Sequence, residues 1–185
     1  MSNETTPEHL ETREKQPTPS IILLDGSKGA GKTTVGTILQ ERIKDIVFLT
    51  LDNERRSLSP SEENITERNK EAFEQLLQKG ARYLDTGINL LIDCGLTNER
   101  IARIEALATE KGSSIHKFLL KASYETQLER VRNRDSAKGN PTDEARFAEV
   151  HDIIHAKEFN DFTVIDTDQL SPVEVAEKII LFITE

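Results

Sequence analysis

The sequence predicts an α/β fold in which helices cover both faces of a parallel sheet. The first sign is a set of short apolar runs, each with the length of a buried strand. The second sign is that polar residues and then a helix-like pattern follow the runs, because alternating strands and helices build a parallel sheet. The runs are Ile21–Leu24, Ile46–Leu51, Ile88–Ile92, Ile115–Leu120 and Phe162–Ile165.

Length, charge and cysteine content exclude several classes of protein. A chain of 185 residues suits one domain with a full core and is too short for two. The net charge of −9 argues against non-specific electrostatic binding of extended nucleic acid. A local group of arginines could still bind phosphate. The single cysteine, Cys94, excludes a disulfide framework, and no apolar run is long enough to span a bilayer.

The N-terminal segment differs in amino-acid composition from the rest of the sequence. Residues 1–18 carry few apolar side chains, several prolines and many charges, so we expect a disordered tail. The segment also lacks the basic and then apolar pattern of a signal peptide, which predicts a soluble protein in a reducing compartment such as the cytoplasm. Residues 19–185 are expected to form the single domain.

A glycine-rich segment follows the first apolar run and opens a helix-like stretch, a context that disfavours a chance match. It fits the pattern G-x-x-x-x-G-K-[ST]. Its glycines let consecutive N–H groups turn inward, so they can surround a phosphate at the start of the helix. Lys32 is expected against the β- and γ-phosphates of a nucleoside triphosphate, and the Thr33 hydroxyl on Mg²⁺. The segment reads Gly26, Ser27, Lys28, Gly29, Ala30, Gly31, Lys32, Thr33 and Thr34.

Charged residues follow the second apolar run, in the sequence Asp52-Asn53-Glu54-Arg55-Arg56. Ligands of parallel sheets bind beyond the carboxyl ends of the strands, so these side chains are expected near the phosphate loop. We expect Asp52 to orient an acceptor hydroxyl or accept its proton, and Arg55 to bind an anionic group of the acceptor. The alternative is that Asp52 caps a helical turn and the arginines belong to the surface.

The third apolar run ends in an acid, Asp93. An apolar strand followed by aspartate is the form of a Walker B carboxylate, which holds Mg²⁺ through water. Any buried strand that ends in aspartate has the same pattern, so a purely structural role for Asp93 stays open at this point.

Three arginines, Arg130, Arg132 and Arg134, occupy a predicted helix after the fourth run. The helix leads into Asp135–Thr142, whose glycine and proline predict a mobile loop. Arginines in such a place suit a lid that closes over transferring phosphates. The alternative is ordinary i,i+4 pairing along the helix, for example with Glu129 or Asp135.

Two further helices have recognisable starts, at Ser59-Pro60-Ser61-Glu62 and at Ser171-Pro172-Val173-Glu174. Each places a serine cap, a proline in the first turn and a glutamate that reaches back. The first start predicts a long charged helix from Pro60 to about Leu84. The second predicts a final helix with one buried stripe. The stripe consists of Val173, Ala176, Ile179, Ile180 and Ile183.

Taken together, these motifs resemble the P-loop kinases grouped around polynucleotide 5′-kinase, zeta toxin and chloramphenicol phosphotransferase. The resemblance spans roughly Ser20 to Ile183 and rests on the glycine-rich segment, Asp52-x-x-Arg55, Asp93 and the run from Leu128 to Arg134. It implies a P-loop NTPase fold of the nucleotide-kinase type, with a five-stranded parallel sheet between two layers of helices and an arginine-bearing lid.

The same resemblance implies residue roles and a reaction. It implies transfer of the γ-phosphoryl group of ATP to a hydroxyl, assisted by Mg²⁺. Lys32 and Thr33 match its phosphate and metal positions, and Asp52 matches the general base. Arg55 matches the arginine that binds the acceptor. The lid positions correspond to Arg130, Arg132 and Arg134, with Arg132 on the nucleotide.

The acceptor stays open at the level of sequence. The segment Asp52-Asn53-Glu54-Arg55 also resembles the Asp-Asn-x-Arg of adenylylsulfate kinase, and the long helix after Pro60 matches no assignable acceptor pocket. A small molecule, a nucleotide or an oligonucleotide end are the expected acceptors. The alternative is a P-loop ATPase or a nucleotide-binding regulatory protein without an acceptor. A GTPase switch is disfavoured, because the sequence has no Asn-Lys-x-Asp signature.

Overall fold

The computed structural model describes residues 18–58, 64–155 and 161–184. The predicted tail, apart from Thr18, and the helix start predicted at Ser59–Glu62 lie outside these residues. No helix in the described part is long and apolar enough to cross a membrane.

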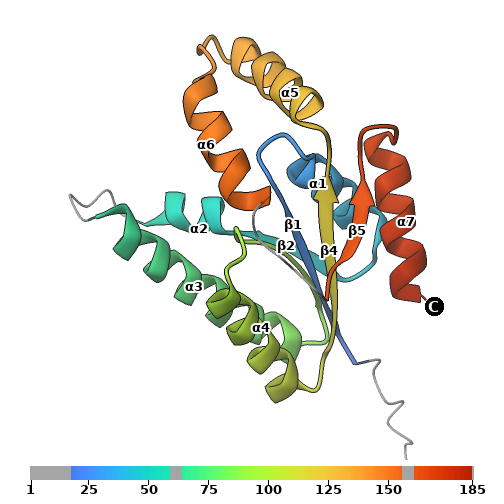
Figure 1. Ribbon diagram of the computed structural model, residues 1–185. Helices are drawn as coiled ribbons and strands as arrows, with labels where there is room; N and C mark the ends of the chain where they lie inside the picture. The colour runs from blue at the N-terminus through green and yellow to red at the C-terminus, as the bar shows by residue number, and fades with distance from the viewer. Residues whose placement is uncertain (1–17, 59–63, 156–160, 185) are drawn as a thin grey trace, which may run out of the picture.

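Five parallel strands form one sheet in the order β2-β3-β1-β4-β5, as the sequence predicts. Each strand coincides with one of the predicted apolar runs, and the first run forms the central strand (Figure 1). The strands are β1 (Ser20–Gly26), β2 (Ile46–Thr50), β3 (Asn89–Asp93), β4 (Ser114–Lys121) and β5 (Thr163–Asp166).

Helices cover both faces of this sheet, in agreement with the predicted three layers. In Figure 1, α3 and α4 lie on one side and α1 and α7 on the other, whereas α5 and α6 stand beyond the carboxyl ends of the strands. The helices are α1 (Lys32–Arg42), α2 (Leu51–Ser57), α3 (Ile65–Asp85), α4 (Asn98–Lys111), α5 (Tyr124–Ala137), α6 (Glu144–His155) and α7 (Pro172–Thr184).

The apolar residues of β1 divide between two cores because side chains alternate along a strand. Ile21 and Leu23 pack in the core beneath α3 and α4, whereas Ile22 and Leu24 pack in the core beneath α1 and α7. All four are fully buried, and each contributes about 1.5–3 kcal/mol relative to an exposed side chain. Burial on both faces explains why the run is continuously apolar rather than alternating.

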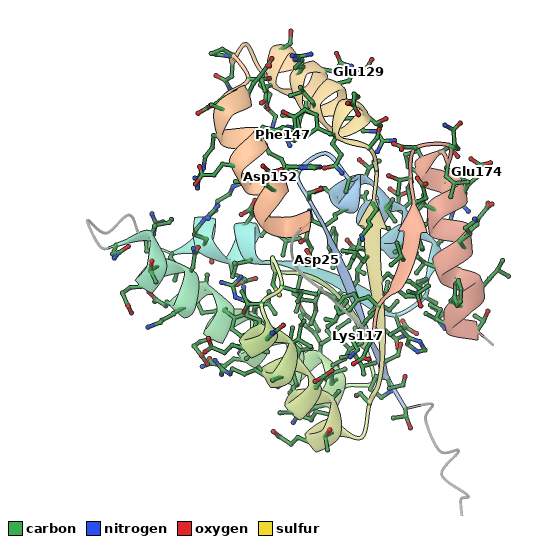
Figure 2. The ribbon with its side chains drawn as sticks, in the orientation of Figure 1. Asp25, Lys117, Glu129, Phe147, Asp152 and Glu174 are labelled. Atoms are coloured by element: carbon green, nitrogen blue, oxygen red, sulfur yellow. The ribbon has the colours of Figure 1, made fainter. Side chains whose placement is uncertain are left out.

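The helices α5 and α6 form a hairpin with a small core of its own. Leu128, Val131 and Phe147 are buried there, and Tyr124 packs against them. The Tyr124 ring meets the Phe147 ring edge to face, with the ring centroids 5.3 Å apart. Figure 2 labels Phe147 between these helices. The loop from residue 138 to 143 joins them, where the sequence predicts a break between two helices.

The predicted start of the last helix is confirmed, but its buried stripe is partly wrong. Glu174 accepts from the backbone N–H of Ser171 (2.7 Å), and its own N–H donates to the Ser171 hydroxyl (3.3 Å). The buried residues of α7 are Val175, Ala176 and Ile179. Val173 is 40% exposed, because it lies on the flank of the helix rather than on the face toward the sheet.

Candidate active site

The glycine-rich segment forms the loop between β1 and α1, at the carboxyl edge of the central strand. Gly29 and Gly31 have φ angles of 89° and 98°, which only glycine adopts without strain. A Cβ atom on Gly29 would lie 2.5 Å from the carbonyl oxygen of Gln127, whereas one on Gly31 would meet nothing within 4 Å. The loop is therefore tightly walled by α5 on one side and open at the start of α1.

The start of α1 has the properties of an anion-binding site. Gly31 is the N-cap and provides no side-chain cap, and no acid lies in the first turn. The first N–H groups of a helix have no partner within it, and they carry the positive end of the helix dipole. Thr33 and Thr34 are exposed in this turn. A phosphate group fits this position in charge and in hydrogen bonding.

Lys32 folds back over the loop from the first turn of α1. Its Nζ donates to the carbonyl oxygens of Gly26 (2.5 Å) and Ser27 (3.3 Å). These neutral acceptors hold the ammonium group beside the loop, at the side where a bound phosphate is expected.

Three acids lie at or just after the carboxyl ends of the neighbouring strands β1, β2 and β3, and one of them, Asp25, is absent from the residues singled out in the sequence. Asp25 is only 4% exposed and lies in β1 just before the loop (Figure 2). Burial raises the pKa of Asp93 to about 6; the charge of Lys32 opposes this rise, and the charges of Asp25 and Asp52 add to it. The strand order, with β3 between β1 and β2, brings these groups together at one edge of the sheet. The signal in the sequence is an acid directly between the first apolar run and the glycine-rich segment.

Asp52 lies in the first turn of α2 but is not its cap. The cap is Thr50, whose hydroxyl accepts from the N–H of Asn53 (3.2 Å), so the alternative of Asp52 as a cap is wrong. The side chain of Asp52 is 63% exposed and accepts from Nη2 of Arg55 at 2.8 Å. Arg55 also donates to Oδ1 of Asn69 in α3 (3.4 Å). Asp52 is thus oriented by Arg55 and accessible to a ligand.

The loop after Asp93 is fixed by Arg100 of α4. Nη1 of Arg100 donates to the carbonyl oxygens of Cys94 (2.5 Å) and Gly95 (2.7 Å). Its guanidinium also lies over the ring of Phe73, 5.4 Å from the centroid. Burial raises the pKa of the Cys94 thiol to about 12, so this cysteine is a packing residue and not a nucleophile.

The three predicted lid arginines point to different partners. Arg130 donates to the carbonyl oxygen of Gly29 (3.3 Å) and to the hydroxyl and carbonyl oxygens of Thr167 (3.1 and 2.7 Å). Arg132 pairs with Glu144 of α6 (2.6 Å), and Arg134 pairs with the adjacent Asp135 (2.8 Å). Of these arginines, Arg130 alone contacts the phosphate loop. Arg134 pairs with Asp135, one of the acids that the alternative interpretation names, whereas Arg132 pairs with the neighbouring helix α6 and not along its own helix.

Two buried polar residues that sequence reasoning missed also contact the phosphate loop. The Thr167 hydroxyl, just after β5, donates to the carbonyl oxygens of Lys121 (3.1 Å) and Ala30 (3.4 Å). Gln127 of α5 is completely buried and accepts from the Ser27 hydroxyl. The signal for Gln127 is a glutamine on the apolar side of a predicted helix. Nothing in the sequence marks Thr167.

The residues present fit a divalent ion held mainly by a nucleotide rather than by the protein. Within the described residues, no group of three or more histidine, cysteine or acidic side chains forms a metal cluster. Mg²⁺ keeps several waters and takes only one or two protein ligands when phosphates supply the rest. Asp93 and Thr33, which is exposed at the end of the phosphate loop, can provide these one or two ligands.

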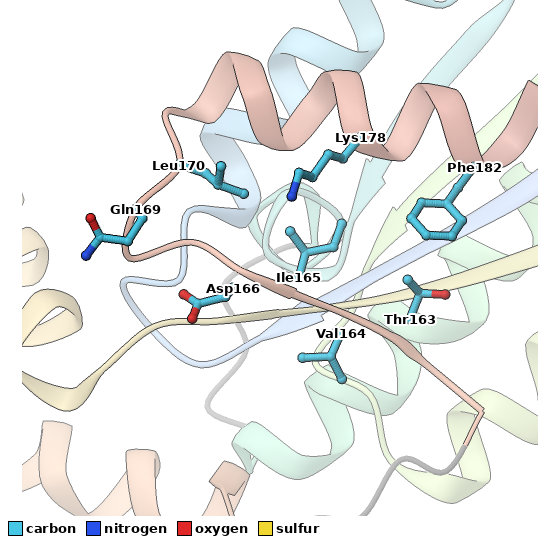
Figure 3. Close-up of a pocket in the computed structure, with 8 residues that line it drawn as sticks. All are labelled: Thr163, Val164, Ile165, Asp166, Gln169, Leu170, Lys178 and Phe182. Carbon is cyan, nitrogen blue, oxygen red and sulfur yellow. The ribbon is translucent and has the colours of Figure 1, made fainter.

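A shallow pocket on the outer side of β5 is separate from this site. Figure 3 shows the groove between β5 and α7. Its lining residues include Val164 and Phe182, both about half exposed, and none belongs to the phosphate loop. The chemistry of the loop and of the carboxylates, rather than this groove, marks the site.

The same fold occurs in several solved structures. A tunicamycin resistance protein from Deinococcus radiodurans superposes with a TM-score of 0.67 at 22% identity, over 89% of this chain and 95% of that one. The Mycobacterium tuberculosis APS kinase CysC, in complex with AMPPNP and APS, gives 0.62 at 15% identity, over 91% and 99%. A chain of the Pnkp1/Rnl/Hen1 RNA repair complex gives 0.63 at 15% identity, over 85% and 55%.

A comparison with curated protein sequences gives no significant match. A protein family described as an AAA domain, in contrast, matches residues 21–155, from the first strand to the end of α6. This segment is most of the sequence and contains the phosphate loop, Asp52, Asp93 and α5. The chain therefore belongs to this AAA-domain family and has the fold of the P-loop kinases.

Proposed function

We propose that this protein is an ATP-dependent phosphotransferase that moves the γ-phosphoryl group to a hydroxyl of a small molecule, a nucleotide or an oligonucleotide end. The observation that carries the proposal is that an exposed acid, Asp52, follows β2 at the same edge of the sheet as the phosphate loop: Thr50 of β2 pairs with Asp93 of β3, and β3 pairs with β1, which leads into the loop. A site that only binds a nucleoside triphosphate does not require the Asp52 carboxylate. The kinase named among the structures of the same fold supports the reaction class.

The phosphates of ATP are assigned to the loop Gly26–Thr34 and the first turn of α1. Lys32 exchanges its two carbonyl partners for the β- and γ-phosphates, a change from neutral to charged acceptors that favours binding. Thr33 and, through water, Asp93 would hold Mg²⁺, which would supply positive charge at the phosphate oxygens.

Asp52 is assigned to the acceptor hydroxyl. The acceptor oxygen attacks the γ-phosphorus, the bond to the β–γ bridging oxygen breaks, ADP leaves, and the hydroxyl proton passes to the Asp52 carboxylate. Arg55 holds Asp52 in place through its 2.8 Å contact and presents the remaining guanidinium surface to an anionic part of the acceptor. This division gives Asp52 the chemical step and Arg55 the orientation.

Arg130 is assigned to the transferring phosphoryl group, because it already lies at the carbonyl oxygen of Gly29. Its positive charge can stabilise the charge that develops on the phosphate oxygens. Arg132 and Arg134 must leave Glu144 and Asp135 before they reach a nucleotide, so their predicted roles require a rearrangement of the α5–α6 hairpin.

The experiment is phosphoryl transfer from labelled ATP to nucleosides, oligonucleotide 5′-ends, sugars, amino-sugar nucleotides and adenylylsulfate, with wild type and Asp52→Asn. We expect one acceptor class to be phosphorylated by the wild type and the rate to fall by about 100-fold or more in Asp52→Asn. Asp85→Asn is the matched control, since Asp85 is an exposed acid paired with Lys111 outside the site.

Two outcomes contradict parts of this proposal. Transfer at an unchanged rate in Asp52→Asn removes Asp52 as the base. Release of inorganic phosphate with no labelled acceptor, unchanged by the same substitution, favours a P-loop ATPase or a nucleotide-binding regulatory protein.

A further inference from the structure

Gln127 is completely buried, and both ends of its side-chain amide make a hydrogen bond. Its Nε2 donates to the carbonyl oxygen of Ala122 (2.7 Å), and its Oε1 accepts from the Ser27 hydroxyl. A carbonyl oxygen can only accept, so Ala122 fixes which end of the amide faces Ser27. The amide thus joins the start of α5 to the second residue of the phosphate loop, 100 positions earlier in the chain.

Ser27 connects Gln127 to the rest of the phosphate loop through hydrogen bonds. Its carbonyl oxygen accepts from the N–H of Ala30 (3.1 Å) and from Nζ of Lys32 (3.3 Å). The residue is 3% exposed, so its hydroxyl has little access to water as a substitute partner. Holding the Ser27 side chain therefore holds the peptide that in turn positions Lys32.

Helix α5 contacts the same loop at two further points. The close approach of Gly29 leaves no room for a Cβ atom beside the Gln127 carbonyl. Arg130, three residues later on the helix, donates to the carbonyl oxygen of Gly29 (3.3 Å). The neighbouring residues Leu128 and Val131 instead pack toward α6. The side-chain amide of Gln127 thus contacts the loop, whereas Leu128 and Val131 contribute to the core of the hairpin.

We propose that Gln127 is a positioning residue for nucleotide binding: through Ser27 it holds the phosphate loop in the conformation that receives the phosphates, with Lys32 and Arg130 in place. The inference rests on the proposed function only in taking a nucleoside triphosphate as the ligand. It adds a role for the first helix of the lid that is independent of lid closure, because the contact exists at the base of α5.

The test is a double-mutant cycle on ATP affinity, measured by calorimetry with Mg²⁺ and without any acceptor. Gln127→Met removes both hydrogen bonds at similar volume, and Ser27→Ala removes the hydroxyl. We expect each to weaken ATP binding roughly five- to tenfold, as the loss of one buried hydrogen bond predicts. The double variant is expected to bind ATP no more weakly than whichever single variant has the lower affinity. The reason is that both substitutions remove the same hydrogen bond between Ser27 and Gln127. In turnover assays, KM for ATP is expected to rise more than kcat falls.

Val131→Ala is the matched control, because Val131 is buried on the same helix but packs away from the loop. It should lower thermal stability and leave ATP affinity unchanged. Hydrogen exchange of the amides of residues 27–31 without nucleotide gives a second reading, with faster exchange expected in Gln127→Met but not in Val131→Ala.

The outcomes separate this inference from the proposed function. The role of Gln127 is overturned if Gln127→Met binds ATP with the affinity of wild type. It is also overturned if the loss of affinity in the double variant equals the product of the losses in the two single variants. If the wild type itself binds no ATP, the proposed function fails, and unchanged exchange of the loop amides in Gln127→Met then overturns the positioning role as well.

Discussion

Asp93 is the residue whose charge the fold controls most directly. Burial disfavours its ionised form, and the charges of Asp25 and Asp52 add to this effect against the attraction of Lys32, so its pKa rises to about 6. A carboxylate with this pKa is ionised at neutral pH, but at a cost that a bound cation can offset. Such an arrangement is typical of functional sites, where stability is exchanged for reactivity or binding.

This pKa predicts a pH dependence of stability with a definite sign. Between about pH 4 and 6 the folded protein holds a proton on Asp93 that the unfolded chain has released, so this group makes the free energy of unfolding fall as pH rises. The total contribution is roughly 3 kcal/mol, from the conversion of two pKa units. Urea unfolding without Mg²⁺ at several pH values should show Asp93→Asn to be more stable than wild type at pH 7.

Asp85→Asn is the control for this measurement, since Asp85 is exposed. An Asp93→Asn variant that is no more stable than wild type at pH 7, with the same pH profile, contradicts the origin of the shift.

Gly29 gives a second prediction at the scale of one residue. Alanine at this position must accept a positive φ of 89° and a Cβ atom 2.5 Å from the Gln127 carbonyl oxygen. Alanine at Gly139 must accept a φ of 71° but meets nothing within 4 Å, so it isolates the cost of the backbone angle. We expect both variants to lose about 1–2 kcal/mol for the angle, and Gly29→Ala alone to lose ATP affinity by more than tenfold.

Thermal unfolding and calorimetric ATP titration of the two variants check this prediction. Equal ATP affinities in Gly29→Ala and Gly139→Ala would show that α5 does not constrain the loop at this point.

At the scale of elements, the α5–α6 hairpin is a unit distinct from the sheet. Its core of Leu128, Val131 and Phe147 is separate from the two cores that cover the sheet. A small separate core is expected to open at a lower free energy than the sheet does. We predict that Phe147→Leu, which also removes the edge-to-face contact with Tyr124, destabilises the hairpin by roughly 1–3 kcal/mol.

Hydrogen exchange followed by mass spectrometry checks where that loss is felt. In Phe147→Leu the amides of α5 and α6 should exchange faster, while those of β1 and β4 keep the rates of wild type. Phe118→Leu, in the core under α1 and α7, is the control that should accelerate exchange in the sheet. Equal acceleration of hairpin and sheet in Phe147→Leu contradicts the separation.

The elements differ in how well the sequence predicts them. The strands could be predicted because strands buried on both faces are continuously apolar, and the glycine-rich loop because its backbone angles require glycine. Leu51 extends the second apolar run but starts α2, since Thr50 caps the helix. Val173 was placed in the buried stripe although the helix turns it outward.

The site could be predicted only in part. Local patterns gave the loop and the acids at the strand ends. Periodicity could not give the partners of Arg132 and Arg134, because a helix face does not say whether a neighbouring acid or a ligand takes the charge. The contact between Ser27 and Gln127 depends on how β4 and α5 pack against the loop, which no local pattern contains.

At the scale of the whole molecule, the strand order explains why the site lies where it does. The central strand β1 has β3 on one side and β4 on the other, and all strands run parallel. The phosphate loop, Asp93 and the start of α5 therefore meet at one edge of the sheet, although they are far apart in the chain. The α2–α3 segment adds Asp52 and Arg55 to this edge from β2, which neighbours β3.

The proposed function requires that the γ-phosphoryl group reach a hydroxyl rather than water. The most direct measurement is ³¹P nuclear magnetic resonance of wild-type protein with ATP, Mg²⁺ and the acceptor panel. We predict a new phosphate ester that accumulates in equal amount with ADP, and no ester with Lys32→Ala. ADP accompanied only by inorganic phosphate, for every acceptor in the panel, would contradict the claim.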